Sequence, residues 1–298
     1  NHLPWGVRHH VLGWAGPSTT AYETRWAAAR ALGVLGPDAA QAVPALTSGL
    51  ADSQAEVSWE IARTLGRIGS NAVPGLIRTL RHESPAVRRL AAYALSEMGP
   101  AAEPATAALV RCLADPEPQV QTTAALALAA IGHAALPGLL ETIENGETSA
   151  RVAAAKGLVW MIPPRRTAVP PLLKMARNND PACRIQALEC LGTLYVTNEP
   201  ALAVIMESLT DPLWEVRAGS VRALSKLGSA AMPALPHLMR LLEDTSPDVR
   251  LASLKAVSCL GDSSVAKAAS AKLAEDLDEQ VRRAASIATE SLPPRHAR

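Results

Sequence analysis

A pattern that returns every 30 to 33 residues constrains this chain more than any other feature of its sequence. The clearest copy is residues 211–228, DPLWEVRAGSVRALSKLG. From Val216, taken as position 0, small or apolar residues follow at positions 4, 5, 8 and 11, which is the spacing of one buried stripe on an α-helix. The other copies start at Thr24, Val57, Val87, Val120, Ala150, Cys183, Val249 and Val281. A fixed period of this length is typical of a solenoid.

Two kinds of helix alternate along the predicted solenoid. The template helix carries the pattern above, and a glycine at position 12 is expected to end it in a left-handed conformation. These glycines are Gly36, Gly69, Gly99, Gly132, Gly228 and Gly261. The other helix opens near a proline, whose fixed φ and missing N–H are tolerated in a first turn. These prolines are Pro44, Pro74, Pro104, Pro137, Pro170, Pro200 and Pro233. The sequence therefore predicts an all-α fold in which each pair of helices is one repeat.

The repeat extends from residue 21 to residue 298 without a break in composition, which predicts a single domain. Residues 1–20 fit the pattern poorly and are interpreted as a capping half-repeat, because a terminal repeat has no neighbour on one face. The chain has no Phe, and aromatic residues make up only 3% of it. A core built from Ala, Leu and Val requires helices that approach one another closely.

Charged residues recur in the turn before the template helix and at its start. Position −5 is Asp52, Asp115, Asp211, Asp244 or Asp276, with Asn145 and Asn178 as substitutes and His82 as the exception. Position +1 is Arg25, Arg88, Arg151, Arg184, Arg217, Arg250 or Arg282, with Ser58 and Gln121 as exceptions. An Asp and an Arg present once per repeat can bridge neighbouring repeats as a structural ladder, and contact with a ligand is the alternative.

On residues 115–132, 211–228 and 244–261, the chain resembles the HEAT repeat family, in particular the short HEAT-like class that includes the phycobilisome lyase-like repeats. The resemblance covers the chain from residue 21 onward. It implies a right-handed α-α superhelix of about eight to nine hairpins with the second helix of each pair on the concave side. It also implies a binding scaffold, because most proteins of this type act in that way.

Catalytic motifs do not support an enzyme. The sequence contains no P-loop, no Gly-x-Ser-x-Gly, no His-Glu-x-x-His and no Gly-x-Gly-x-x-Gly. The similar deoxyhypusine hydroxylases hold a di-iron site with several His-Glu pairs, whereas this chain has one pair, His82-Glu83. We therefore expect no metal, no cofactor and no enzymatic activity. A lyase-type HEAT-like subunit stays as an alternative, since no motif separates it from a plain scaffold.

Positions 2, 6 and 10 of the template helix are expected to lie outside the buried core, and they follow one another along a single stripe of the helix. The resemblance places this stripe on the concave face. The residues predicted to bind there are Trp26, Arg30, Trp59, Arg63, Arg67, Arg89, Tyr93, Trp160, Arg222, Lys226 and Lys255. Trp, Tyr and Arg dominate the energetics of protein interfaces. Packing of Trp26 and Trp59 over the joint between repeats is the competing interpretation.

The stripe favours a protein or peptide partner of acidic or mixed apolar and acidic character. Nucleic-acid binding by the same basic stripe is the alternative, but 29 basic and 28 acidic residues give no general attraction for phosphates.

The sequence contains no uninterrupted run of about 20 apolar residues, so no membrane span is predicted. The four cysteines show no regular framework and fit a reducing compartment, so we expect a cytoplasmic protein. We also expect a monomer. Because the first residue is Asn1, a larger parent protein or a removed signal segment stays open.

Overall fold

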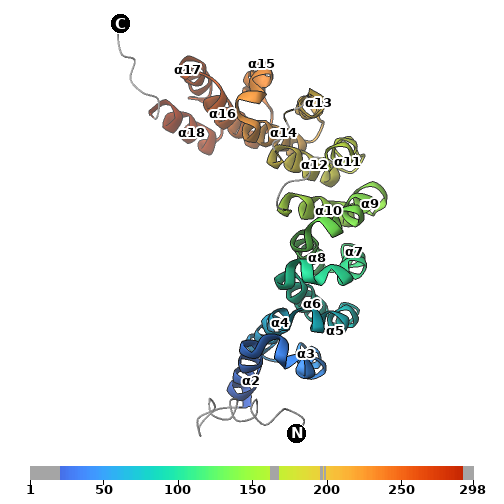
Figure 1. Cartoon of the computed structure of the whole chain (residues 1–298). Coiled ribbons are helices and arrows are strands. Elements are labelled where there is room, and N and C mark those ends of the chain that lie inside the picture. The colour runs from blue at the N-terminus through green and yellow to red at the C-terminus, as the bar shows by residue number, and fades with distance from the viewer. Residues whose placement is uncertain (1–20, 162–167, 195–196, 198, 291–298) are drawn as a thin grey trace. The chain divides into compact units, whose positions relative to one another are not determined.

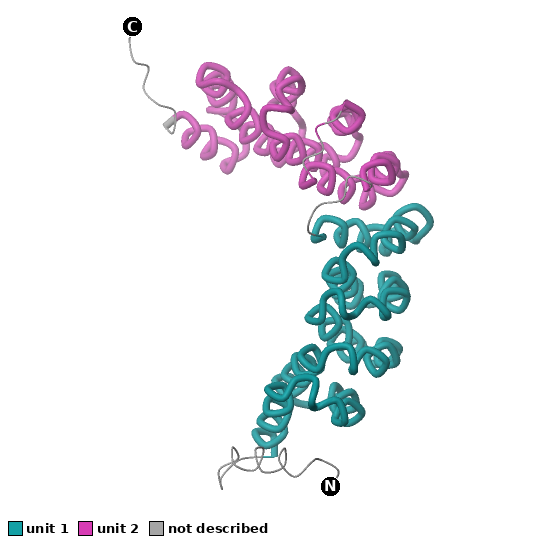
Figure 2. Tube along the Cα trace, viewed as in Figure 1, with its two compact units in different colours: residues 1–164 teal, residues 165–298 magenta. Residues whose placement is uncertain are grey.

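The computed structural model describes residues 21–161, 168–194, 197 and 199–290 (Figure 1). Contacts divide the chain into two compact units, Asn1–Pro164 and Arg165–Arg298 (Figure 2). Every regular element in the described part is an α-helix or a 3-10 helix, which confirms the all-α fold. The two units are described separately. The predicted capping half-repeat at 1–20 lies outside the described residues, as does the join at 162–167, so one uninterrupted domain stays a prediction.

Unit 1 contains two rows of helices. The template helices form one row, and each packs against the next. They are α2 (Ala21–Leu35), α4 (Ala55–Ile68), α6 (Pro85–Met98), α8 (Pro118–Ile131) and α10 (Thr148–Trp160). Shorter helices form the other row: α3 (Val43–Gly49), α5 (Val73–Thr79), α7 (Thr106–Cys112) and α9 (Leu136–Asn145). The 3-10 segments η1 (Gly36–Ala42), η2 (Gly69–Ala72), η3 (Gly99–Ala105) and η4 (Gly132–Ala135) connect one repeat to the next.

Unit 2 has the same two rows. Its template helices are α12 (Pro181–Thr193), α14 (Trp214–Leu227), α16 (Pro247–Leu260) and α18 (Glu279–Glu290). The shorter helices of its other row are α11 (Val169–Met175), α13 (Glu199–Glu207), α15 (Leu235–Arg240) and α17 (Ser263–Lys272). The 3-10 segments are η6 (Ser208–Thr210), η7 (Gly228–Ala234) and η8 (Leu241–Glu243). Within each unit, the repeated packing of short helix on template helix makes a solenoid.

The predicted core stripe is buried. Val216, Ser220, Val221 and Leu224 on α14 have no exposed surface, and Leu227 is only 5% exposed. The buried Ser220 hydroxyl donates a hydrogen bond to the Val216 carbonyl at 3.0 Å, so this polar group needs no partner from another helix. Small residues allow close packing, since a Cβ on Gly192 of α12 would lie 2.8 Å from Ala223 Cα of α14.

The glycines at position 12 end their helices, and five of the six have the predicted left-handed φ. Gly69, for example, combines φ 76° with ψ −144°, a region that favours glycine and turns the chain directly into the next 3-10 segment. Gly36, Gly99, Gly132 and Gly228 also have positive φ. Gly261 differs, with φ −78° and ψ 163°. There Asp262 caps α17 by accepting hydrogen bonds from Ser264 N and Val265 N, so helix α17 begins at once and no 3-10 segment is required.

One helical stretch among the described residues, Pro118–Asn145, is long and apolar enough to cross a membrane. It comprises α8, η4 and α9, which belong to neighbouring hairpins and are separated at Gly132, where φ is 82°. Half of its most apolar window is buried against other parts of the protein. Burial in the solenoid core therefore accounts for the apolar composition, and the stretch is weak evidence for a membrane span.

Candidate protein-binding surfaces

The recurring Asp and Arg residues meet across neighbouring repeats. In unit 2, Arg217 Nε and Nη2 each donate to the carboxylate of Asp244 at 2.7 Å. Arg217 Nη1 also donates to the carbonyls of Asp211 and Pro212 in its own turn, at 2.9 and 3.1 Å. The same carboxylate of Asp244 accepts from Ser246 N at 2.8 Å. One arginine thus joins two turns, and both side chains are largely buried, with 13% and 7% of their surfaces exposed.

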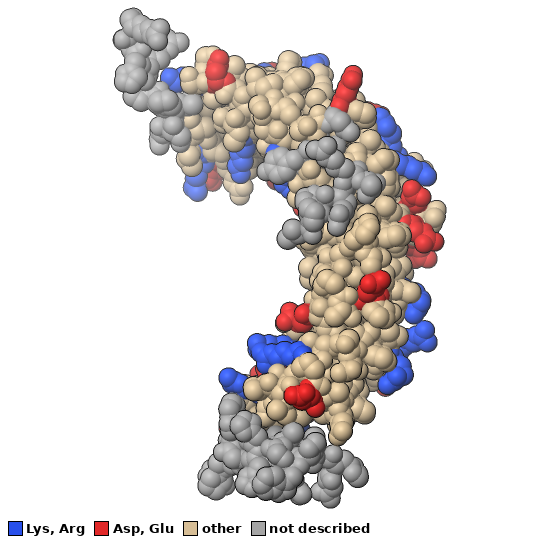
Figure 3. Space-filling model, in the orientation of Figure 1, with Lys and Arg blue, Asp and Glu red and all other residues tan. Residues whose placement is uncertain are grey.

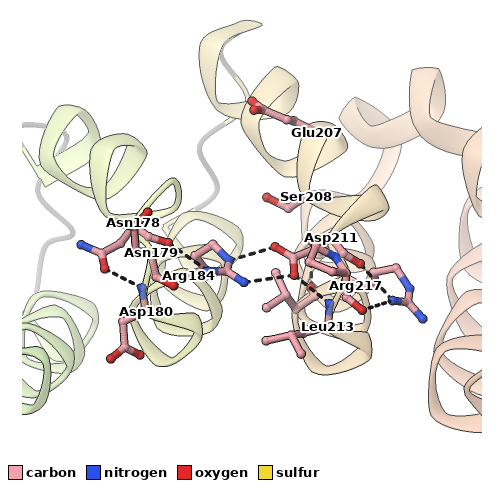
Figure 4. Close-up of polar contacts among 12 residues, drawn as sticks. Asn178, Asn179, Asp180, Arg184, Glu207, Ser208, Asp211, Leu213 and Arg217 are labelled. Carbon is pink, nitrogen blue, oxygen red and sulfur yellow. Dashed lines mark hydrogen bonds and ion pairs between the residues drawn. The ribbon is translucent and has the colours of Figure 1, made fainter.

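The same pair recurs at four other repeat junctions. The pairs are Arg25 with Asp52, Arg88 with Asp115, Arg184 with Asp211, and Arg250 with Asp276. Figure 4 shows Arg184 reaching from the turn at Asn178 and Asn179 to Asp211. Because these groups are occupied by one another and by backbone, they have little capacity left to hold a ligand. The geometry therefore favours the structural alternative for Asp52, Asp115, Asp211, Asp244, Arg88, Arg184, Arg217 and Arg250.

Hydrogen bonding and charge lower the pKa values of two ladder carboxyls, Asp244 and Asp276. The hydrogen bonds from Arg250 hold the pKa of Asp276 below its ordinary value, although partial burial opposes the effect. Burial alone would raise the pKa of Asp244, but the hydrogen bonds from Arg217 and Ser246 N outweigh it, and the pKa is lowered. These two carboxylates are therefore ionised at neutral pH and stabilise the folded state there.

At two repeat junctions of unit 1, the arginine and the aspartate of the ladder pair are both replaced. Where Ser58 replaces the arginine, the next turn carries His82, and where Gln121 replaces it, the next turn carries Asn145. His82 preserves the shape of the turn, because its Nδ1 accepts a hydrogen bond from Ser84 N at 3.0 Å, as Asp side chains do elsewhere. Asn145 does not take this role: it is the exposed last residue of α9, and its prediction as an Asp substitute is wrong. Asn178 does, accepting from Asp180 N at 2.8 Å.

On the template row of unit 1, aromatic and arginine side chains from two neighbouring helices, α4 and α6, gather on one face. Trp59 of α4 is 36% exposed, and its ring meets Tyr93 of α6 edge to face with centroids 4.8 Å apart. The Arg89 guanidinium lies over the same indole at 5.5 Å, and Arg89 Nη1 donates to Gln119 Oε1 at 3.2 Å. We call Trp59, Arg63, Arg67, Arg89 and Tyr93 the Trp59 patch.

Trp26 and Arg30 of α2 make a separate cation–π pair, with the Arg30 guanidinium 5.1 Å from the Trp26 ring centroid. Trp26 is half-buried and Arg30 is exposed. Trp160, by contrast, stands at the last residue of α10 with 37% of its surface exposed, two template helices beyond α6. The structure thus assembles the predicted N-terminal residues on α4 and α6 and leaves Trp160 apart from them.

Glu60 of α4 lies beneath the Trp59 patch and not on the exposed stripe. It is only 6% exposed, at position 3 of the template helix. Arg63 and Arg67 turn back toward it, with nitrogen-to-oxygen distances of 3.5 and 3.8 Å to its carboxylate. Arg67 crosses onto α2, because a Cβ on Gly33 would lie 3.1 Å from its Nη1. The buried Glu60 carboxylate therefore neutralises part of the positive charge of the Trp59 patch.

On unit 2, the predicted residues Arg222, Lys226 and Lys255 line a groove of about 630 Å³ between α14 and α16. Trp214 and Leu251 contribute apolar surface, and Glu215 and Asp248 also line the groove. Trp214 is 41% exposed and was not predicted as a site residue, because it precedes position 0 of the template. Tryptophan is rare in this chain, which has six, so its presence two residues before position 0 could have indicated a site residue.

Metal-binding and reactive thiol groups are not prominent in the part of the chain that the structure describes. That part contains no group of three or more His, Cys, Asp and Glu residues able to hold a metal ion. Cys112, Cys183 and Cys190 are buried free thiols, and Cys259 is an exposed one. Burial raises the pKa of the Cys112 thiol to about 11, which makes it a poor nucleophile at neutral pH.

Both units are α-solenoids of short helical hairpins stabilised by charged turns, with side chains for contact on the template row. The family model described as HEAT repeats matches residues 18–77, 43–129, 73–159, 106–181, 136–225 and 203–290. These matches span nearly the whole chain, and the chain belongs to the HEAT repeat family. It is a HEAT-repeat scaffold, as the resemblance implied.

One solved structure has the same fold, and two others align with lower TM-scores. The X-ray structure of the Escherichia coli protein YibA aligns with a TM-score of 0.52 and 17% identity over 93% of this chain and 100% of that one, which shows a common fold. An engineered protein aligns with a TM-score of 0.42 and 21% identity over 63% and 98%. The complex of CpcE and CpcF of phycocyanin lyase from Nostoc sp. PCC7120 gives 0.47 and 24% over 51% and 98%. No curated protein sequence matches the chain.

Proposed function

We propose that this protein is a non-enzymatic scaffold that binds a protein or peptide segment on the exposed face of its template helices. The observation that carries the proposal is the Trp59 patch. Trp59 is one of the largest apolar side chains of the protein, yet more than a third of it faces solvent. Tyr93 and Arg89 hold its ring in place from the neighbouring helix.

The held ring is suited to binding because little side-chain freedom is left to lose when a partner arrives. Ordered Trp, Tyr and Arg side chains at the centre of a surface are the usual anchors of protein interfaces. The packing alternative explains the edge contact with Tyr93, but it does not account for the exposed part of the Trp59 side chain. An interface role accounts for both.

An acidic or mixed apolar and acidic partner suits the cations of the template row, and nucleic acid stays the alternative. Glu60 neutralises part of the positive charge beside Trp59, and Glu97 adds a further carboxylate next to Tyr93. A phosphate backbone would meet these carboxylates at close range, whereas a peptide can place apolar groups there. Binding governed by the tryptophan should also depend only weakly on salt, unlike phosphate binding.

A peptide-display selection against the full chain, followed by affinity measurements on single variants, tests the proposal. We expect selected peptides to bind Trp59→Ala about 2 kcal/mol more weakly while the melting temperature is retained. Arg63→Ala should weaken binding too. Its control is Arg78→Ala, which removes an exposed arginine from α5 in the other row. The proposal would be contradicted if no selected peptide bound Trp59→Ala more weakly than the parent protein.

A further inference from the structure

We propose that the groove between α14 and α16 binds an extended peptide of a partner protein in which an apolar residue and two acidic residues alternate, in the pattern apolar-x-acidic-x-acidic along the groove. The proposal rests on the proposed scaffold function and assigns a ligand class to unit 2. It is carried by a groove within one unit, by three cations that have no ion-pair partner among the described residues, and by an apolar surface beside them.

The cations of the groove are available to a ligand. Arg222, Lys226 and Lys255 are all exposed. In the described part of the chain, no carboxylate lies within ion-pairing distance of any of the three, and Lys226 Nζ donates only to the neutral Thr193 hydroxyl at 2.9 Å. Figure 3 shows basic side chains gathered along one edge of unit 2. Carboxylates of a partner can therefore approach without displacing an existing ion pair.

The groove has opposite charges at its two ends. A second depression is lined by Trp214 from the first turn of α14 and by Pro247 and Asp248 from the first turn of α16, so the two helices begin side by side. Glu215 and Asp248 belong to these first turns, while Lys226 lies in the last turn of α14. An acidic ligand segment is therefore repelled at the Trp214 end and attracted toward the Lys226 end.

The spacing of the side chains matches an extended peptide. Leu251 and Lys255 are four residues apart on α16, and Arg222 and Lys226 are four apart on α14, so each step is about 6 Å along its helix. Alternate residues of an extended chain are about 6.6 Å apart and point to the same side. An apolar side chain at Leu251 and Trp214 would thus place the next two carboxylates near Lys255 with Arg222 and then near Lys226.

The test uses the full chain and a fluorescein-labelled synthetic peptide with Leu-Ser-Glu-Ser-Glu at its centre, read by fluorescence anisotropy. We expect saturable binding that weakens at least tenfold in Lys255→Glu and at least fivefold when the peptide leucine is replaced by serine. The matched control is Lys174→Glu, which makes the same charge change at an exposed position of α11. It should change the affinity less than twofold.

Three results would overturn the proposal. The first is no binding by the parent protein, and the second is equal loss in Lys255→Glu and Lys174→Glu, which would indicate general charge attraction. The third is tighter binding of an oligothymidine of equal charge that is lost in Lys255→Glu, which would assign the groove to nucleic acid. The display selection and Trp59→Ala in unit 1 report on the scaffold function separately, so a failure of this groove alone is recognisable.

Discussion

The template rows of the two units offer different chemistry at equivalent repeat positions. In unit 1, Trp59 and Tyr93 provide aromatic surface, and Arg63 and Arg67 lean toward the buried Glu60. In unit 2, Arg222 and Lys255 occupy position 6 of adjacent helices, and no carboxylate of the described residues pairs with them. Unit 1 therefore presents a partly neutralised aromatic patch, and unit 2 presents a groove whose cations have no ion-pair partner among the described residues.

The comparison shows how one repeat can carry several binding surfaces. The core depends on positions 0, 4, 5, 8 and 11, and the turns depend on the Asp and Arg pair. Side chains at positions 2 and 6 mostly take no part in the core or in the Asp and Arg pairs. They can therefore change without altering the packing of the repeats. Where the fold needs position 2, the freedom is lost, as at the fully buried Ala218.

The largest effect should come from cavities in the core of each unit. Leu224→Ala in unit 2 and Leu95→Ala in unit 1 remove equally buried side chains and should each cost about 3 kcal/mol of unfolding free energy. Hydrogen exchange should show lost protection mainly in the unit that carries the substitution, since repeats contact only their neighbours. Equal loss in both units for either variant would mean that the two surfaces cannot be varied independently.

Loss of one Arg–Asp pair of the ladder should lower the unfolding free energy somewhat less than a core cavity does. Arg217→Ala removes two bonds to Asp244 and two to backbone carbonyls, and should lower the unfolding free energy by about 2 kcal/mol. Arg25→Ala removes a pair in which the arginine is 45% exposed, so its effect should be much smaller. Urea unfolding of the two variants checks the order. A larger loss for Arg25→Ala would contradict a role for burial in the strength of the rungs.

The contribution of the Arg217 rung should depend on pH. The pKa of Asp244 is lowered in the folded state, so the stability from this carboxylate is present above its unfolded pKa of about 4 and is lost as pH falls through the folded value. The difference in unfolding free energy between the parent protein and Arg217→Ala should be constant from pH 7 to about 5 and shrink below about 4. A difference that widens in acid would show that the sign is wrong.

The smallest effect concerns the charge balance of the Trp59 patch. Glu60→Gln keeps the buried shape and removes the charge to which Arg63 and Arg67 turn. An acidic peptide that binds unit 1 should then bind about threefold more tightly, while the affinity of the unit 2 groove for the Leu-Ser-Glu-Ser-Glu peptide stays the same. Titration of both peptides against the parent and Glu60→Gln proteins measures the change. Weaker binding in unit 1 would mean that Glu60 organises the arginines for the ligand.

The period and its stripe were sufficient to predict the helices, their pairing and the buried face, because burial repeats with the helix. Local substitutions were harder to interpret. His82 was an exception in sequence, yet its ring nitrogen replaces a carboxylate oxygen in the turn. Gly261 follows the pattern, but the cap at Asp262 changes the conformation it needs. Glu60 and Trp214 lie at positions that the template did not describe, so their burial and exposure required coordinates.

Melting and affinity measured on the same samples of Trp59→Ala and Trp214→Ala test most directly whether the template rows are binding surfaces. Peptides selected by display should bind Trp59→Ala at least tenfold more weakly, and the Leu-Ser-Glu-Ser-Glu peptide should bind Trp214→Ala at least tenfold more weakly. Both proteins should melt within a few degrees of the parent. Lowered melting temperatures with unchanged affinities would contradict the account and would assign both tryptophans to packing between repeats.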